Sequence, residues 1–339
     1  MSGFTVGVAI LGGLVLALLV AWNAWANRRN APRQPEVAVS LSPGDPAPPA
    51  EPTLDLELPV PAHAERKATL DPLIDTIAPL AVDAPVSGDA ALAALPPTRR
   101  VGSKPFAIEG RDAATGHWET PRPGRRYAAF QAGVQLASRT GALNEIEFSE
   151  FVMKAQAFAD AVNAAPEFPE MLQEVARARE LDQFASAHDA QLSFTLRARN
   201  AAWSPGYLQQ SAARHGFVAG AIPGRMVLPA RMDGGLPVLA LSFDTQAALA
   251  EDPAHTAVRE VTLSLDVPQV SRTEQPFVRM RDAAIALAAS MDGLITDDRG
   301  EVIRAEALDV IGNDLETLYD TLESRDLPAG SAQARRLFS

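Results

Sequence analysis

Apolar and polar positions repeat with two different periods along this chain, and the periods predict a mixed α and β fold after residue 100. Apolar residues recur at every third or fourth position in segments 148–162, 172–188, 277–291 and 308–322, as in amphipathic helices. Ser204-Pro205 and Gly216 are residue types that begin and end a further helix. Strand-like patterns occupy 104–109, 117–120, 131–137, 191–197, 217–222, 238–243, 260–267 and 294–296.

The predicted fold class is therefore α+β, with a mostly antiparallel sheet and helices packed on one face. In segments 238–243 and 260–267 the larger apolar residues share one face, and small or hydroxylic residues occupy the other. Helices are expected to cover the apolar face. The second face stays open to solvent or to a partner.

A long uncharged segment near the N-terminus predicts a membrane anchor. Phe4 to Ala26 carry no charge, and Arg28, Arg29 and Arg33 follow directly. At about 1.5 Å per residue, a helix of this length crosses a hydrocarbon core of about 30 Å. The arginines on its carboxyl side predict that the N-terminus faces outward and that the remainder of the chain is cytoplasmic. A cleaved signal peptide is the alternative, but such peptides have a basic segment before a shorter apolar core.

Residues 31–100 differ in composition from the rest of the chain. They hold 14 of the 27 prolines, and ten acidic residues outnumber four basic ones. Closely spaced prolines oppose helices and strands, and like charges extend a chain. The segment is predicted to be a disordered linker that tethers the folded part to the anchor.

Composition excludes several classes of function. A net charge of -12 argues against general nucleic-acid binding, and the absence of cysteine excludes disulfides and cysteine-ligated metals. Asp292, Asp297 and Asp298 lie close together in the sequence, and paired carboxylates can bind a cation or transfer protons. Asp-Asp-Arg-Gly is also an ordinary turn sequence, which is the favoured interpretation. No catalytic residue, metal site or cofactor is assigned, and the chain is predicted not to be an enzyme.

The order of parts and three motifs resemble the ZipA family of bacterial cell-division proteins. The motifs are VTLSLDVPQV (Val261 to Val270), FVRMRDAAIALAASMDGLITDDRGEVI (Phe277 to Ile303) and RHGFVAGAIPG (Arg214 to Gly224). In this family an anchored protein with a Pro-rich linker ends in a domain that binds the C-terminal tail of the tubulin-like protein FtsZ. The resemblance thus implies a tether that holds division filaments at the inner membrane at mid-cell.

The resemblance also implies a domain plan and a binding groove. The plan comprises an anchor (1–30), the linker (31–100), an accessory or integral segment of strands and two helices (101–189), the FtsZ-binding domain (190–325) and a tail (326–339). The implied groove positions on the open face are Ser193, Thr195, Ile222, Gly224, Ala240, Ser242, Thr262 and Ser264. The family groove is rich in large apolar residues, whereas these positions are mostly small or hydroxylic, so weaker tail binding is expected.

Two alternatives to this function remain open: a membrane-anchored scaffold for another protein partner, and an enzyme with a dispersed site. A weak internal similarity also exists between SRTGALNEIEF (138–148) and DDRGEVIRAEAL (297–308), each leading into a predicted helix. Turn-and-helix sequences often produce such matches, so a duplication is not assigned.

The charge asymmetry around Phe4 to Ala26 generates the first prediction. A reporter enzyme fused after Ser339 should be active only if it is a type that works in the cytoplasm. The measurement is a paired assay with a cytoplasm-dependent and a periplasm-dependent reporter at the same position. Activity of the periplasm-dependent fusion would overturn the predicted topology.

Overall fold

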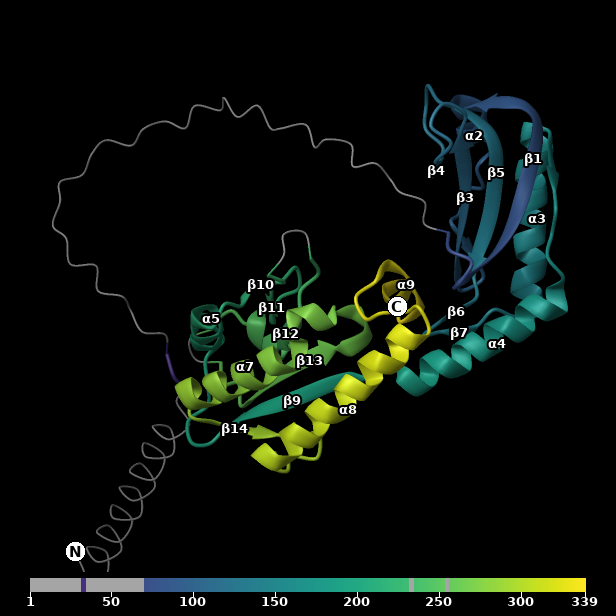
Figure 1. The fold of residues 1–339 in the computed structure, drawn as a ribbon. Helices are drawn as coiled ribbons and strands as arrows, with labels where there is room; N and C mark the ends of the chain where they lie inside the picture. The colour runs from purple at the N-terminus through teal and green to yellow at the C-terminus, as the bar shows by residue number, and fades with distance from the viewer. Residues whose placement is uncertain (1–31, 35–69, 232–234, 254–255) are drawn as a thin grey trace, which may run out of the picture. The chain divides into compact units, whose positions relative to one another are not determined.

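The computed structural model describes residues 32–34, 70–231, 235–253 and 256–339, which divide into two compact units (Figure 1). Unit 1 comprises Ala190–Gly330 and Met1–Leu41, of which residues 32–34 are described. Unit 2 comprises Ser42–Asp189, described from residue 70, and Ser331–Ser339. Both units are α+β with antiparallel sheets, which confirms the predicted class.

Unit 2 is built on a six-stranded sheet in which β2, β3, β5, β1 and β8 are neighbours in that order and β4 pairs with β3. A separate two-stranded sheet pairs β6 with β7. The elements are β1 (Asp75–Ser87), α2 (Gly88–Ala94), β2 (Arg100–Val101), β3 (Lys104–Asp112), β4 (Trp118–Glu119), β5 (Arg126–Gln135), β6 (Ala137–Ser138), β7 (Gly141–Ala142), α3 (Glu145–Val162), β8 (Ala164–Pro166), α4 (Met171–His188) and α9 (Ala332–Leu337).

Unit 1 has a six-stranded sheet in the order β10, β11, β12, β13, β9, β14. Its elements are β9 (Gln191–Ala198), α5 (Pro205–Arg214), β10 (Val218–Ala219), β11 (Arg225–Leu228), β12 (Leu239–Ser242), α6 (Thr245–Ala248), β13 (Glu260–Asp266), η1 (Val267–Gln269), η2 (Arg272–Glu274), α7 (Pro276–Met291), β14 (Gly293–Thr296) and α8 (Ala305–Ser324).

The two units share one topology. In each, a first strand and a short helix are followed by a run of antiparallel strands, a long helix, a further strand and a last long helix. In each sheet the first strand, β1 or β9, lies between the strand that precedes the long helix and the strand that follows it. Helix α3 therefore corresponds to α7, and α4 to α8. The sequence similarity noted above leads instead into α3 and α8, so it does not follow this correspondence.

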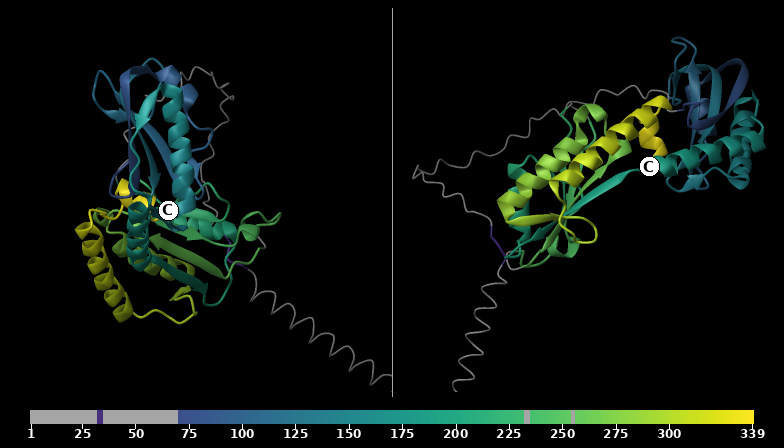
Figure 2. Two further views of the ribbon diagram at one scale, coloured as in Figure 1. Left: turned by 90° about the vertical axis from the view of Figure 1, so that its right-hand side faces the viewer. Right: turned by 60° about the horizontal axis from the view of Figure 1, so that its bottom comes forward.

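Each sheet buries one face under its helices. In unit 2, Phe106 and Phe130 of the sheet meet Phe151 and Phe158 of α3 edge to face, with ring centroids 6.1 and 5.2 Å apart. In unit 1 the apolar side of α7 is buried, and α7 and α8 lie side by side on one face of the sheet (Figure 2). Helix α5 begins as predicted, because the Ser204 hydroxyl accepts from the Tyr207 amide and Pro205 is the first helical residue.

The predicted linker, 31–100, is wrong over its last part, because residues from 75 onward form β1 and α2. Pro79 is tolerated in β1 because its carbonyl accepts from the Glu167 amide, away from β5. Its missing N–H lies on that same side, where no ladder bond to β5 is lost. Pro85 lies where the pairing of β1 with β5 shifts register, a place where proline is also accommodated.

The predicted tail, 326–339, is likewise ordered in the structure. Helix α9 buries Leu337, and the following Phe338 is buried too. Arg336 of α9 donates to both carboxylate oxygens of Asp75 at 2.5 and 2.9 Å. Asp75 is 1% exposed, and burial raises its pKa while Arg336 opposes the rise. Segment 101–189 is therefore part of a unit of its own that also needs residues near 75 and 336.

The predicted anchor, Phe4 to Ala26, lies outside the described residues. Within the described ranges, every helix is too short or too polar to cross a bilayer. Arg33 is described, and it belongs to unit 1. Its amide donates to the Ala202 carbonyl at 2.7 Å, and its carbonyl accepts from the Ser204 amide at 3.0 Å.

The Asp75–Arg336 pair generates a stability prediction. Arg336→Ala would leave a buried carboxylate without its cation, a change that typically costs about 3–5 kcal/mol. The free energy of unfolding should fall by about this much at pH 7. It should fall less at acid pH, because the pKa of Asp75 lies above its unfolded value and protonation removes the buried charge.

The measurement is urea unfolding of the full chain in detergent, followed by fluorescence at several pH values. Asp75→Asn combined with Arg336→Ala is the matched control, since it lacks the buried charge. Equal destabilisation by the single and double variants would show that the charge is not the cause.

Candidate functional site

The face of the unit 1 sheet opposite the helices is the candidate binding surface, here called the open face. Cross-strand partners lie on the same face of an antiparallel sheet. Ala240 pairs with Ser264 and Ser264 with Ser193, while Ser242 pairs with Thr262 and Thr262 with Thr195. Six of the eight predicted groove positions are therefore adjacent on the open face.

The neighbours of these residues in the sequence point into the core. Leu239, Leu241, Val261, Leu263 and Leu265 are 2% exposed or less, whereas five of the six open-face residues are partly buried and Ser193 is exposed. This alternation fixes the register of β12, in which Ala240 and Ser242 face away from the helices. The Ser264 hydroxyl donates to the Ala240 carbonyl at 3.3 Å, so its hydrogen is already bonded within the sheet.

The other two predicted groove positions lie in a turn. Ile222 is 54% exposed, and its carbonyl accepts from the Arg225 amide. Gly224 is buried with φ of 77°, a backbone conformation that favours glycine. A Cβ there would lie 2.8 Å from the Phe243 carbonyl oxygen. Placing Gly224 on the groove surface was wrong, because its role is to let the turn approach β12.

The apolar part of the open face was missed in the sequence. The strand predicted at 217–222 is shorter, and β11 follows the Pro223-Gly224 turn. Val227 pairs with Val218 on one side and with Ala240 on the other, so these three form an apolar row beside the hydroxylic residues. Val218 is 49% exposed. The alternation Arg225-Met226-Val227, with Met226 buried, was the available signal.

Arg225 adds a charge to this surface. It pairs with Ser242 across β11 and β12, so it lies on the open face, and it is exposed. Its guanidinium has no hydrogen-bond or ion-pair partner in the part of the chain that the structure describes. The open face thus combines small apolar residues, hydroxyls and the Arg225 guanidinium, which suits an extended peptide carrying apolar and acidic side chains.

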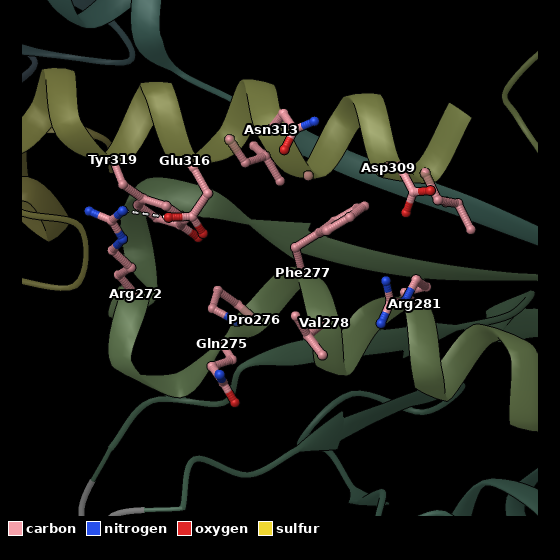
Figure 3. Close-up of a pocket in the computed structure, with 13 residues that line it drawn as sticks. Arg272, Gln275, Pro276, Phe277, Val278, Arg281, Asp309, Asn313, Glu316 and Tyr319 are labelled. Atoms are coloured by element: carbon pink, nitrogen blue, oxygen red, sulfur yellow. Dashed lines mark hydrogen bonds and ion pairs between the residues drawn. The ribbon is translucent and has the colours of Figure 1, made fainter. Parts of the chain in front are cut away.

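Apart from the open face, unit 1 has a hollow of about 420 Å³ between α7 and α8 (Figure 3). Phe277, Leu308 and Leu315 supply apolar surface. At one end Arg272 is bound to Asp320 at 2.8 Å and to Glu316 at 2.5 Å, and these hydrogen bonds raise its pKa. Burial raises the pKa of Tyr319 beside them. With their pKa values raised, Arg272 and Tyr319 both stay protonated near neutral pH, so neither is suited to accept a proton there.

The acidic residues noted around β14 have structural roles. Asp292 accepts from Arg33 at 3.0 Å and from Asn200 at 3.1 Å. Asp297 accepts from the amides of Arg299 and Glu301, which is the turn interpretation of this sequence. In the described ranges, no group of three or more His, Asp or Glu side chains could hold a metal ion.

The corresponding face of unit 2 is partly covered by the chain itself. Leu70 lies against Gly133, where an added Cβ would be 2.5 Å from the leucine methyl. The Leu70 amide donates to Glu109 at 3.2 Å, and Gln131 donates to the other oxygen of that carboxylate at 2.9 Å. Glu109 is fully buried as a result. The open face of unit 1 carries the apolar row and the Arg225 guanidinium described above.

Comparisons with protein-family models and with curated proteins find no match to this chain.

Proposed function

We propose that this chain is a membrane-anchored cell-division protein whose unit 1 binds the C-terminal tail of FtsZ through the open face. The observation that carries the proposal is the sheet of unit 1, in which helices cover one face and predicted groove residues from three strands are neighbours on the other. This arrangement agrees with what the resemblance to the ZipA family implies. The proposal assigns no catalytic role.

The chemistry of the open face supports an extended peptide as the ligand. Val218, Val227 and Ala240 offer apolar area, and Arg225 offers a guanidinium that can bind a carboxylate. The apolar row is small, so a single tail should bind weakly. Filaments present many identical tails close to an anchored protein, and multivalent attachment then compensates for weak single contacts.

A scaffold for a different protein partner is the second candidate. It is favoured by the hydroxylic residues Ser193, Thr195, Thr262 and Ser264, which bury an apolar anchor less favourably than large aliphatic residues. The two candidates share the surface and differ in the partner. A fluorescent fusion separates them in cells, because an FtsZ tether should form a band at mid-cell.

Binding of a labelled FtsZ tail peptide to the full chain in detergent tests the proposal. Val227→Ala removes an apolar contact and should weaken binding about five- to hundredfold, as expected for about 1–3 kcal/mol. Ser264→Arg places a bulky charge at the centre of the open face and should weaken it at least about tenfold. Fluorescence anisotropy gives both dissociation constants.

Val310→Arg is the matched control, because Val310 is 60% exposed on α8, on the helix side of the sheet. It should leave both binding and the unfolding midpoint unchanged. If Val227→Ala and Ser264→Arg both bind the tail as tightly as wild type, the open face is not the surface that binds the tail. A wild-type chain that does not bind the tail at all would favour the second candidate.

A further inference from the structure

The segment next to the predicted anchor is docked on unit 1. Residues 32–34 lie beside the loop that leads into α5, next to the start of β14 (Figure 1). The backbone of Arg33 bridges to Trp203 through its bonds to residues 202 and 204, and its guanidinium donates to Asp292 at 3.0 Å. Main-chain and side-chain contacts therefore fix the position of Arg33 on this unit.

The surface that receives Arg33 is part of the core of unit 1. Trp203 is fully buried, and its indole N–H donates to the Met291 carbonyl at 2.8 Å. Its backbone exchanges two hydrogen bonds of 2.8 Å with Val258. The site that binds Arg33 is therefore built on a buried tryptophan that is itself bridged to Val258.

The distance along the chain between the anchor and this site is short. Six residues separate Ala26 from Arg33, and a fully extended chain between these two positions reaches about 25 Å. The Pro-rich segment follows Arg33, so it connects unit 1 to unit 2 and not the anchor to unit 1. A tether of about 150 Å would separate the anchor from the folded residues only if Leu70 were the first point of attachment.

We infer that the end of unit 1 that holds Arg33 faces the membrane, where it contacts anionic lipid headgroups. This inference rests on the proposed function, since it requires the anchor. Arg199 and Arg259 are exposed at this end, next to Asp292 and Ala198 through backbone hydrogen bonds. Arg28 and Arg29 precede the docked residues in the sequence. Arginines held near an anionic surface are attracted to it, and the attraction falls off within a Debye length.

The opposite end of unit 1 should lie farther from the bilayer. Helix α7 runs back from η2 toward Met291, whose carbonyl binds Trp203. Its 16 residues span about 24 Å, so a probe at Thr273 is about that much farther from the docked end. The two ends of this helix therefore provide a near and a far position for measurement.

The chain has no cysteine, so single-cysteine variants can be labelled at one chosen place. Ala257→Cys, exposed and adjacent to Val258, reports the docked end, and Thr273→Cys, also exposed, reports the far end. The full chain is incorporated in vesicles of phosphatidylglycerol and phosphatidylcholine that carry a quencher on the lipid headgroup. The fluorophore at position 257 should be quenched more strongly than the one at position 273.

Arg33→Pro removes the amide and the guanidinium that hold the segment, and it should abolish the difference between the two positions. Asn30→Pro is the matched control, because it also introduces a proline in this segment but before the docked residues. The difference in quenching between positions 257 and 273 should then persist. Equal quenching at both positions in vesicle-bound wild-type chain would overturn the inference alone. A chain that does not float with the vesicles would overturn the anchor, and the proposed function and this inference with it.

Discussion

In both sheets the first strand in the sequence holds two later strands together by pairing with one on each side. In unit 1, β9 pairs with β13 along one edge and with β14 along the other, and in unit 2, β1 pairs with β5 and β8 in the same way. The first strand therefore pairs only with strands that are made later and lie far from it in the sequence. The helices that connect those partners must then cross on one side, because they return the chain to the same sheet. This connectivity leaves the second face of each sheet free of these helices.

Sequence patterns predicted the long helices and most central strands of unit 1, because their apolar residues repeat with the periods of the structure. Ser204-Pro205 also predicted the start of α5, since an N-cap and a first-turn proline act locally. Strand β1 was missed because proline was taken to exclude a ladder. Whether Pro79 loses a bond depends on which neighbour its N–H would face, and that is a tertiary property.

The candidate site could be predicted in part, because its strands show the alternation of apolar and polar residues. Alternation assigned Ser193, Thr195, Thr262 and Ser264 to one face, and strand pairing brought them together. It could not place Gly224, whose value lies in a positive φ and a close approach to Phe243. Nor could it show that a residue near the anchor joins unit 1, because a single bridged residue has no period.

The return of the chain to unit 2 has a consequence for synthesis. Asp75 and Arg336 are 261 residues apart, and the whole of Ala190–Gly330 is translated between them. Domains generally fold in the order in which they are made. The strands of unit 2 are made before those of unit 1, but the buried carboxylate of Asp75 lacks its cation until Ala190–Gly330 has been made. The unit whose sheet emerges first is therefore the last to be completed, and the nascent chain carries an unpaired carboxylate at Asp75 while the sheet of unit 1 forms.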